Sequence, residues 1–182
     1  MANKKSKVAF HAQSIYDIDP HFFLELGVKA VVTDLDNTLD PADVFHPTDK
    51  AKKLVKELLD LGLRVLILSN NTEKRCGMYC KEIQVPYLSS SFKYWAFRIR
   101  KFLKKQGLKV EECIFIGDQI YTDRIYVQQL KGRFILTEPL VERDNWVTKI
   151  PRFFDRRVRE GWRKKGLLGQ ECPTRIAKEE EK

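Results

Sequence analysis

Short apolar runs alternate along the chain with segments of helical character, and this alternation constrains the fold more than any other feature. The apolar run at residues 28–33 is followed by a segment in which Ala51, Leu54, Val55 and Leu58 recur at helical spacing. An apolar run this short, bounded by turn residues, has the length of a buried strand. Repeated strand-then-helix units favour an α/β fold, a three-layer sandwich in which about five parallel strands carry helices on both faces.

Capping and turn residues set the expected boundaries of these elements. Asp19 and Pro20 begin the first helix and Gly27 ends it, while Thr48 begins the second and Gly62 ends it. The expected strands are residues 28–33, 64–69, 85–89, 113–117 and 133–136, and the expected later helices are residues 72–81, 93–106 and 122–131.

The size of the chain favours one domain. With 182 residues it is long enough for one sizeable core, so we expect a single domain over residues 1–165 and a flexible C-terminal tail over residues 166–182. No run approaches the roughly 20 apolar residues that cross a bilayer. The basic residues at the start are not followed by an apolar block of signal-peptide length, so we expect a cytoplasmic protein.

The formal charge of +9 is unevenly distributed. Residues 92–106 carry six basic residues and no acid, and residues 149–165 carry eight basic and two acidic residues. Such patches favour anionic partners, meaning phosphorylated substrates, lipid headgroups or RNA, but charge alone does not choose among them.

Polar residues collect where the expected strands end. Carboxyl ends of parallel strands meet at one edge of a sheet, where helix N-termini and loops converge and ligands bind. In chain order the strand-end residues are Asp34, Asp36 and Thr38, then Ser69 and Asn70, then Lys93, then Gly117, Asp118 and Asp123.

Several carboxylates at one point need a counter-charge, because they repel one another and resist burial. A hard divalent cation, most plausibly Mg²⁺, supplies it and also neutralises a bound phosphate. Asp34 is the candidate nucleophile, since a covalent phospho-aspartate divides one difficult displacement into two easier ones. Asp36 would act as general acid and base, and Ser69 and Lys93 would hold the phosphoryl oxygens.

These ordered motifs resemble those of the haloacid dehalogenase (HAD) superfamily of Mg²⁺-dependent phosphotransferases. The stretches SIYDIDPHFFLELGVKAVVTDLDNTL, LSNN and GDQIYTD together resemble the subclass IIIA phosphatases of the YqeG family, over roughly residues 10–160. Eukaryotic relatives of that family are mitochondrial phosphatidylglycerophosphate phosphatases. The resemblance implies a Rossmann-like HAD fold, Mg²⁺ as cofactor and phosphomonoester hydrolysis, with phosphatidylglycerophosphate as the favoured substrate.

The resemblance also implies roles for individual residues. Tyr94 follows Lys93, where the family commonly has proline. Carried over to the matching positions, the roles are Asp34 as nucleophile and metal ligand, Asp36 as acid/base with its main-chain carbonyl on the metal, Asp118 as second carboxylate ligand, Ser69, Asn70 and Lys93 on the substrate phosphate, and Thr38, Gly117 and Asp123 in support.

Motif spacing leaves no room for a cap domain. Only 30 residues lie between Thr38 and Ser69, and 23 between Ser69 and Lys93. An open site cannot close over a small metabolite, so a large or surface-held substrate is the more natural one.

Two alternatives stay open from the sequence. Phe153, Val158 and Trp162 recur near helical spacing among arginines, which is typical of a helix at an anionic membrane, here the inner membrane face, and equally of a final helix covering the sheet. The chain could also be a binding module that keeps a metal and phosphate site while its basic helices dock RNA or a ribosomal particle. Retention of both Asp34 and Asp36 makes nucleic acid the less favoured partner.

Overall fold

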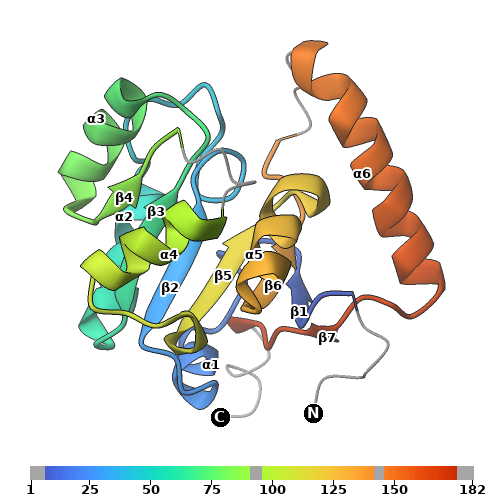
Figure 1. Ribbon diagram of the computed structural model, residues 1–182, viewed down its shortest axis with the longest axis horizontal. Coiled ribbons are helices and arrows are strands. Elements are labelled where there is room, and N and C mark those ends of the chain that lie inside the picture. The colour runs from blue at the N-terminus through green and yellow to red at the C-terminus, as the bar shows by residue number, and fades with distance from the viewer. Residues whose placement is uncertain (1–6, 91–95, 142–145, 176–182) are drawn as a thin grey trace.

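A sheet of seven parallel strands forms the centre of the molecule (Figure 1). The computed structural model describes residues 7–90, 96–141 and 146–175. The strands lie in the order β4-β3-β2-β5-β6-β1-β7. Their bounds are β1 Phe10–Ala12, β2 Ala30–Asp34, β3 Arg64–Leu68, β4 Tyr87–Leu88, β5 Cys113–Gly117, β6 Arg133–Thr137 and β7 Gln170–Glu171.

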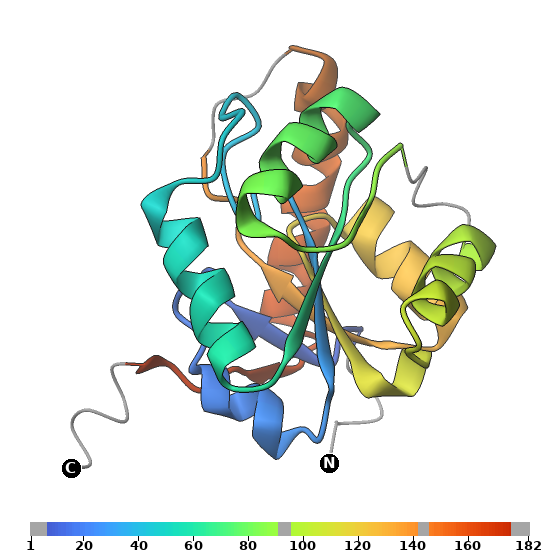
Figure 2. The same cartoon turned by 90° about the vertical axis from the view of Figure 1, so that its left-hand side faces the viewer.

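Helices cover both faces of the sheet (Figures 1 and 2). One face packs against α1 Pro20–Glu25, α2 Asp49–Asp60 and α3 Glu73–Ile83. The other packs against α4 Ala96–Lys105, α5 Ile125–Leu130 and α6 Trp146–Lys164. Two short segments, η1 Val110–Glu112 and η2 Ile120–Arg124, flank β5. The expected α/β sandwich is therefore confirmed.

The alternation of side chains along the strands divides the core between the two faces. In β2, Val31 packs with the helices of the first face and Val32 with those of the second. Both side chains are fully buried, as expected for central strands of a parallel sheet. The apolar stripe of α2 (Ala51, Leu54, Val55, Leu58) is buried against the first face.

Side-chain caps begin α1 and α2 where the sequence predicted them. The Asp19 carboxylate accepts a hydrogen bond from the His21 amide at 2.9 Å, and Thr48 Oγ1 accepts one from the Ala51 amide at 3.2 Å. Each cap satisfies an amide that the first helical turn leaves without a main-chain partner.

The chain order places a crevice at the carboxyl ends of β2 and β5. From β2 the chain builds β3 and β4 on one side and then returns to build β5 and β6 on the other. The connections after β2 and β5 therefore diverge, and ligands of open parallel sheets bind at such a point. The expected strand ends carrying Asp34 and Asp118 are thus neighbours.

The edge of the sheet differs from the prediction. Besides the five expected strands, β1 and β7 extend it beyond β6. The expectation of a flexible tail from residue 166 is wrong for residues 166–175, because β7 pairs with β1 and Cys172 is buried. With three and two residues, β1 and β7 carry too short a pattern to be recognised, whereas the equally short β4 lies within the longer apolar stretch at residues 85–89.

The expected basic helix near the C-terminus is present as α6. Val158 and Trp162 pack against the second face of the sheet, which supports the alternative in which this helix covers the core. Among the residues that the structure describes, no helix combines the length and apolar character needed to cross a membrane.

Candidate active site

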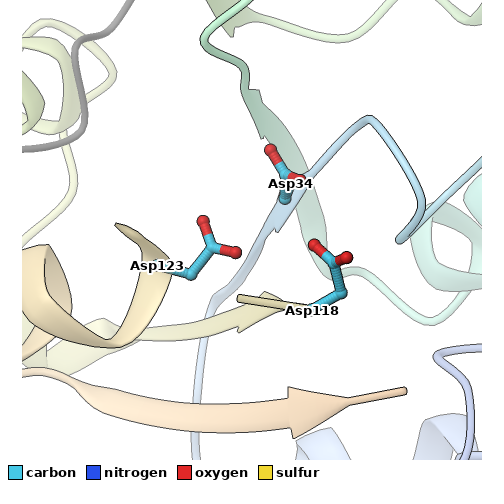
Figure 3. Close-up of side chains that lie close together, drawn as sticks. All are labelled: Asp34, Asp118 and Asp123. Carbon is cyan, nitrogen blue, oxygen red and sulfur yellow. The ribbon is translucent and has the colours of Figure 1, made fainter. Parts of the chain in front are cut away.

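Three buried carboxylates face one another at the crevice (Figure 3). Asp34 is the last residue of β2, Asp118 directly follows β5, and Asp123 lies in η2. One oxygen from each lies within 4.8 Å of the others. Their exposed fractions are 4%, 3% and 0%, so water does little to screen their mutual repulsion.

A close approach between Gly117 and Asp123 shapes this cluster. A Cβ at position 117 would lie 2.4 Å from Asp123 Oδ2, so Asp123 would have to shift to make room for any side chain there. The same oxygen accepts a hydrogen bond from the Gln119 amide at 3.0 Å. Asp123 therefore folds back over the end of β5, and glycine is required there for space.

The donor set fits a hard divalent cation. Carboxylate oxygens are the ligands that Mg²⁺ prefers, and Mg²⁺ usually keeps several waters beside one or two carboxylates. Three acids at this separation repel one another, and a cation among them would offset that repulsion. Asp34, Asp118 and Asp123 would hold the cation, and the structure thus brings Asp123, predicted in a supporting role, into one group with the two predicted carboxylate ligands.

The side chain of Asp36 lies apart from the cluster and is held by Arg75. Arg75 Nη2 and Nε donate to Asp36 Oδ1 at 2.7 and 3.2 Å, and Asn71 Nδ2 donates to Oδ2 at 3.4 Å. Arg75 is 4% exposed and also donates to the carbonyl of Val44. Arg75 was not among the predicted site residues. Its position in the first turn of α3, six residues after Ser69, is the only signal the sequence offers.

Ser69 joins the end of β3 to the first motif. Its hydroxyl donates to Asp36 Oδ2 at 3.2 Å and accepts from the Asn71 amide at 3.0 Å. Asn70 beside it is exposed at the same edge of the sheet. Lys93 lies outside the described residues, so its place in the site stays a prediction.

A buried acid braces the loop that follows the first motif. Asp40, at 3% exposure, accepts hydrogen bonds from the Thr48 hydroxyl at 2.7 Å and from Tyr79 Oη at 2.6 Å. Burial, together with this bond to Asp40, raises the pKa of Tyr79. Thr38 is also buried, 1% exposed, as fits a supporting residue.

A relative with a functional name covers most of the chain. No family model matches the chain. The chain is 30% identical over 156 residues to the protein named probable phosphatase YqeG of Bacillus subtilis (strain 168), covering 86% of this chain and 91% of that protein.

Solved structures resemble the chain in fold. A protein of Listeria monocytogenes serotype 4b, described as uncharacterized, matches with a TM-score of 0.52 and 16% identity, over 65% of this chain and 84% of that chain. The cobalt-bound deoxy-D-mannose-octulosonate 8-phosphate phosphatase (YrbI) of Haemophilus influenzae matches at 0.47 and 16% identity, over 63% and 80% of the two chains. The sequence relationship extends over nearly the whole length of both proteins, and the chain therefore belongs to the YqeG family.

Proposed function

We propose that the chain is a Mg²⁺-dependent phosphomonoester hydrolase that acts through a phospho-aspartate at Asp34. The observation that carries the proposal is the group of three buried carboxylates within 4.8 Å at the point where the chain order of the sheet reverses. The Bacillus subtilis relative is named a probable phosphatase, which supports the same reaction class.

In the first step an Asp34 oxygen attacks phosphorus. The bond from Asp34 to phosphorus forms as the bond from phosphorus to the ester oxygen breaks, and the departing alkoxide takes a proton from Asp36. When bound among Asp34, Asp118 and Asp123, Mg²⁺ would supply charge neutralisation for the phosphoryl oxygens.

In the second step Asp36 takes a proton from water, and the water oxygen attacks the phosphorus of phospho-Asp34. The bond to Asp34 breaks, and inorganic phosphate leaves. Ser69, Asn70 and Lys93 would bind the phosphoryl oxygens, where negative charge is spread in both transition states.

Substitution of the two motif acids tests this function. Asp34→Asn should lower the turnover of p-nitrophenyl phosphate with Mg²⁺ by about 10⁴-fold or more, because the amide is a far poorer nucleophile than the carboxylate. Asp36→Asn should abolish turnover as well, because the water of the second step then has no base. Asp43→Asn, which changes an exposed acid of the following loop, is the matched control. Circular dichroism should show all three variants folded. Turnover that survives in Asp34→Asn would remove the nucleophile assignment.

For the substrate we propose a phosphomonoester on an anionic lipid headgroup, and phosphatidylglycerophosphate is the favoured one. The chain would bind this substrate by peripheral contact with a membrane face. Support comes from basic side chains exposed on α4 and α6. These are Arg100, Lys101, Lys104 and Lys105 on α4, and Arg156, Arg157, Arg163 and Lys164 on α6. Basic side chains near an anionic surface each contribute about 1 kcal/mol of attraction.

A substrate panel decides between lipid and other phosphates. The chain should release phosphate from phosphatidylglycerophosphate in anionic vesicles faster than from sugar phosphates or nucleotides, and it should float with those vesicles at low salt. A salt-sensitive shift with RNA and no turnover on any phosphate would instead favour the binding-module alternative.

A further inference from the structure

Two side chains of α6 form hydrogen bonds with the main chain next to the Asp118 carboxylate, one at Asp118 and one at Ile120. Arg159 of α6 is 6% exposed, and its Nη2 donates to the carbonyl oxygen of Asp118 at 2.6 Å. Its Nη1 donates to the carbonyl oxygen of Thr137, the last residue of β6, at 2.9 Å. One guanidinium therefore ties the end of β5 to the end of β6.

Asp155, one helical turn before Arg159 in α6, binds the main chain at the start of η2. Its Oδ1 accepts a hydrogen bond from the amide of Ile120 at 2.8 Å, and its Oδ2 lies 3.3 Å from Arg159 Nη2. Ile120 is the first residue of η2, and an amide at a helix start has no main-chain partner within that helix. Asp155 thus caps η2, the segment that carries Asp123, from a distant part of the chain.

Charge and burial make this pair costly to break. Asp155 is 7% exposed, and burial raises its pKa, whereas Arg159 and the Ile120 amide counter this effect. Glu138 also lies 3.2 Å from Arg159 Nη1. Separating the two members of a buried, hydrogen-bonded pair leaves each charge without its partner. Movement of Asp155 away from Arg159 is therefore unfavourable.

We propose that Asp155 and Arg159, here called the α6 clamp, are positioning residues for the metal site. Repulsion among Asp34, Asp118 and Asp123 favours movement of these carboxylates away from one another, and a bound cation would offset it. The α6 clamp opposes that movement, because it fixes the main chain at Asp118 and at the start of η2. Groups that orient metal ligands in this way typically change metal affinity by about 10- to 100-fold. The inference uses the proposed function only for the identity of the ion.

Calorimetric titration of the full chain with Mg²⁺ is the first test. Arg159→Met should bind Mg²⁺ about 10-fold more weakly than the native chain. Arg159→Lys should weaken binding too, because a single ammonium cannot serve both carbonyl oxygens as the planar guanidinium does. Arg156→Met is the matched control, since it changes an exposed arginine of the same helix and should leave the affinity unchanged.

Amide hydrogen exchange in EDTA is the second test, and it depends on neither metal nor turnover. The Ile120 amide should exchange slowly in the native chain and in Arg156→Met, and at least about 10-fold faster in Arg159→Met. A protein in which Arg159 merely stabilised the fold would instead show faster exchange throughout the sheet.

The outcomes separate the α6 clamp from the proposed function. Unchanged Mg²⁺ affinity and unchanged Ile120 exchange in the Arg159 variants would overturn the clamp, whatever the turnover. A native chain that binds Mg²⁺ but hydrolyses no phosphomonoester would overturn the function alone. If Arg159→Met does not fold, Arg159→Lys and Asp155→Asn decide by the same two measurements.

Discussion

At the scale of single residues, the site depends on side chains that lie against main chain with no space to spare. Gly117 and Asp123 are the sharpest case, because a Cβ would meet Oδ2, Cγ and Cβ of the aspartate at 2.4 to 2.7 Å. The backbone at Gly117 does not adopt a positive φ, so the glycine is needed for space rather than for conformation.

Gly117→Ala should therefore push Asp123 away from Asp34 and Asp118. We expect Mg²⁺ affinity to fall by about 10-fold or more, and the free energy of unfolding by about 1 to 3 kcal/mol, as for other overpacked core positions. Calorimetry and thermal unfolding measure the two effects. Gly161→Ala in α6 is the control, since open space surrounds that position and alanine there should be neutral or slightly stabilising. Equal affinities for the two variants would contradict the prediction.

Arg75 offers a second test at this scale, because it holds the carboxylate proposed to protonate the leaving group. In Arg75→Met, Asp36 keeps only its contacts to Ser69 and Asn71. Misplacing a general acid matters most for a leaving group that cannot depart without a proton. We expect kcat/KM to fall by about 100-fold for an alkyl phosphate and much less for p-nitrophenyl phosphate.

The neighbouring Lys74→Met is the control for Arg75, because Lys74 is exposed on the same helix. Its kcat/KM should match that of the native chain on both substrates. Equal losses on both substrates in Arg75→Met would show that Arg75 does not act through the leaving-group proton.

At the scale of elements, a helix or strand could be predicted where the sequence shows a cap or an apolar run. The helices α1 and α2 were predicted because Asp19 and Thr48 cap them, and β2, β3, β5 and β6 because each lies in an apolar run of five residues or so. The two-residue β4 was predicted because it lies within the longer apolar stretch at residues 85–89. The strands β1 and β7 were missed, since three and two residues carry no period. Their pairing depends on main-chain contacts between segments about 160 residues apart.

The contribution of β7 can be measured with two shortened chains. A chain ending at Lys165 loses the main-chain hydrogen bonds from Gln170 to Ala9 and from Cys172 to His11, and exposes the edge of β1. Each net main-chain bond contributes about 1 kcal/mol, so we expect a loss of several kcal/mol and a tendency to aggregate. A chain ending at Arg175 retains these contacts and is the control. Similar unfolding midpoints for the two chains in urea would refute this role of β7.

At the scale of the whole molecule, stability should depend on the metal. A cation that binds only the folded chain stabilises it by about 2.7 kcal/mol at a concentration 100 times its dissociation constant. Mg²⁺ should therefore raise the midpoint of thermal unfolding, and EDTA should lower it.

Asp118→Asn should change the unfolding midpoint both in EDTA and in Mg²⁺. Removing one of three buried like charges relieves repulsion, so in EDTA this variant should unfold at a higher temperature than the native chain. Added Mg²⁺ should then raise its midpoint far less, because a ligand has been lost. A native-like response to Mg²⁺ would place the ion away from Asp118. Calorimetric scans of the native chain and of Asp118→Asn, with and without Mg²⁺, measure both changes in the unfolding midpoint.

The sequence by itself determined the class of fold and the residues at the strand ends. Asp34, Ser69 and Asp118 could be assigned to one edge because parallel strands with helical crossovers all present their carboxyl ends there. Only the tertiary structure decided that Asp123 completes the carboxylate group, that Arg75 holds Asp36, and that Asp155 and Arg159 reach back from α6. These contacts join segments between 5 and more than 40 residues apart by the packing of particular side chains. Neither local periodicity nor capping residues indicate such packing, so these contacts become visible only in the folded structure.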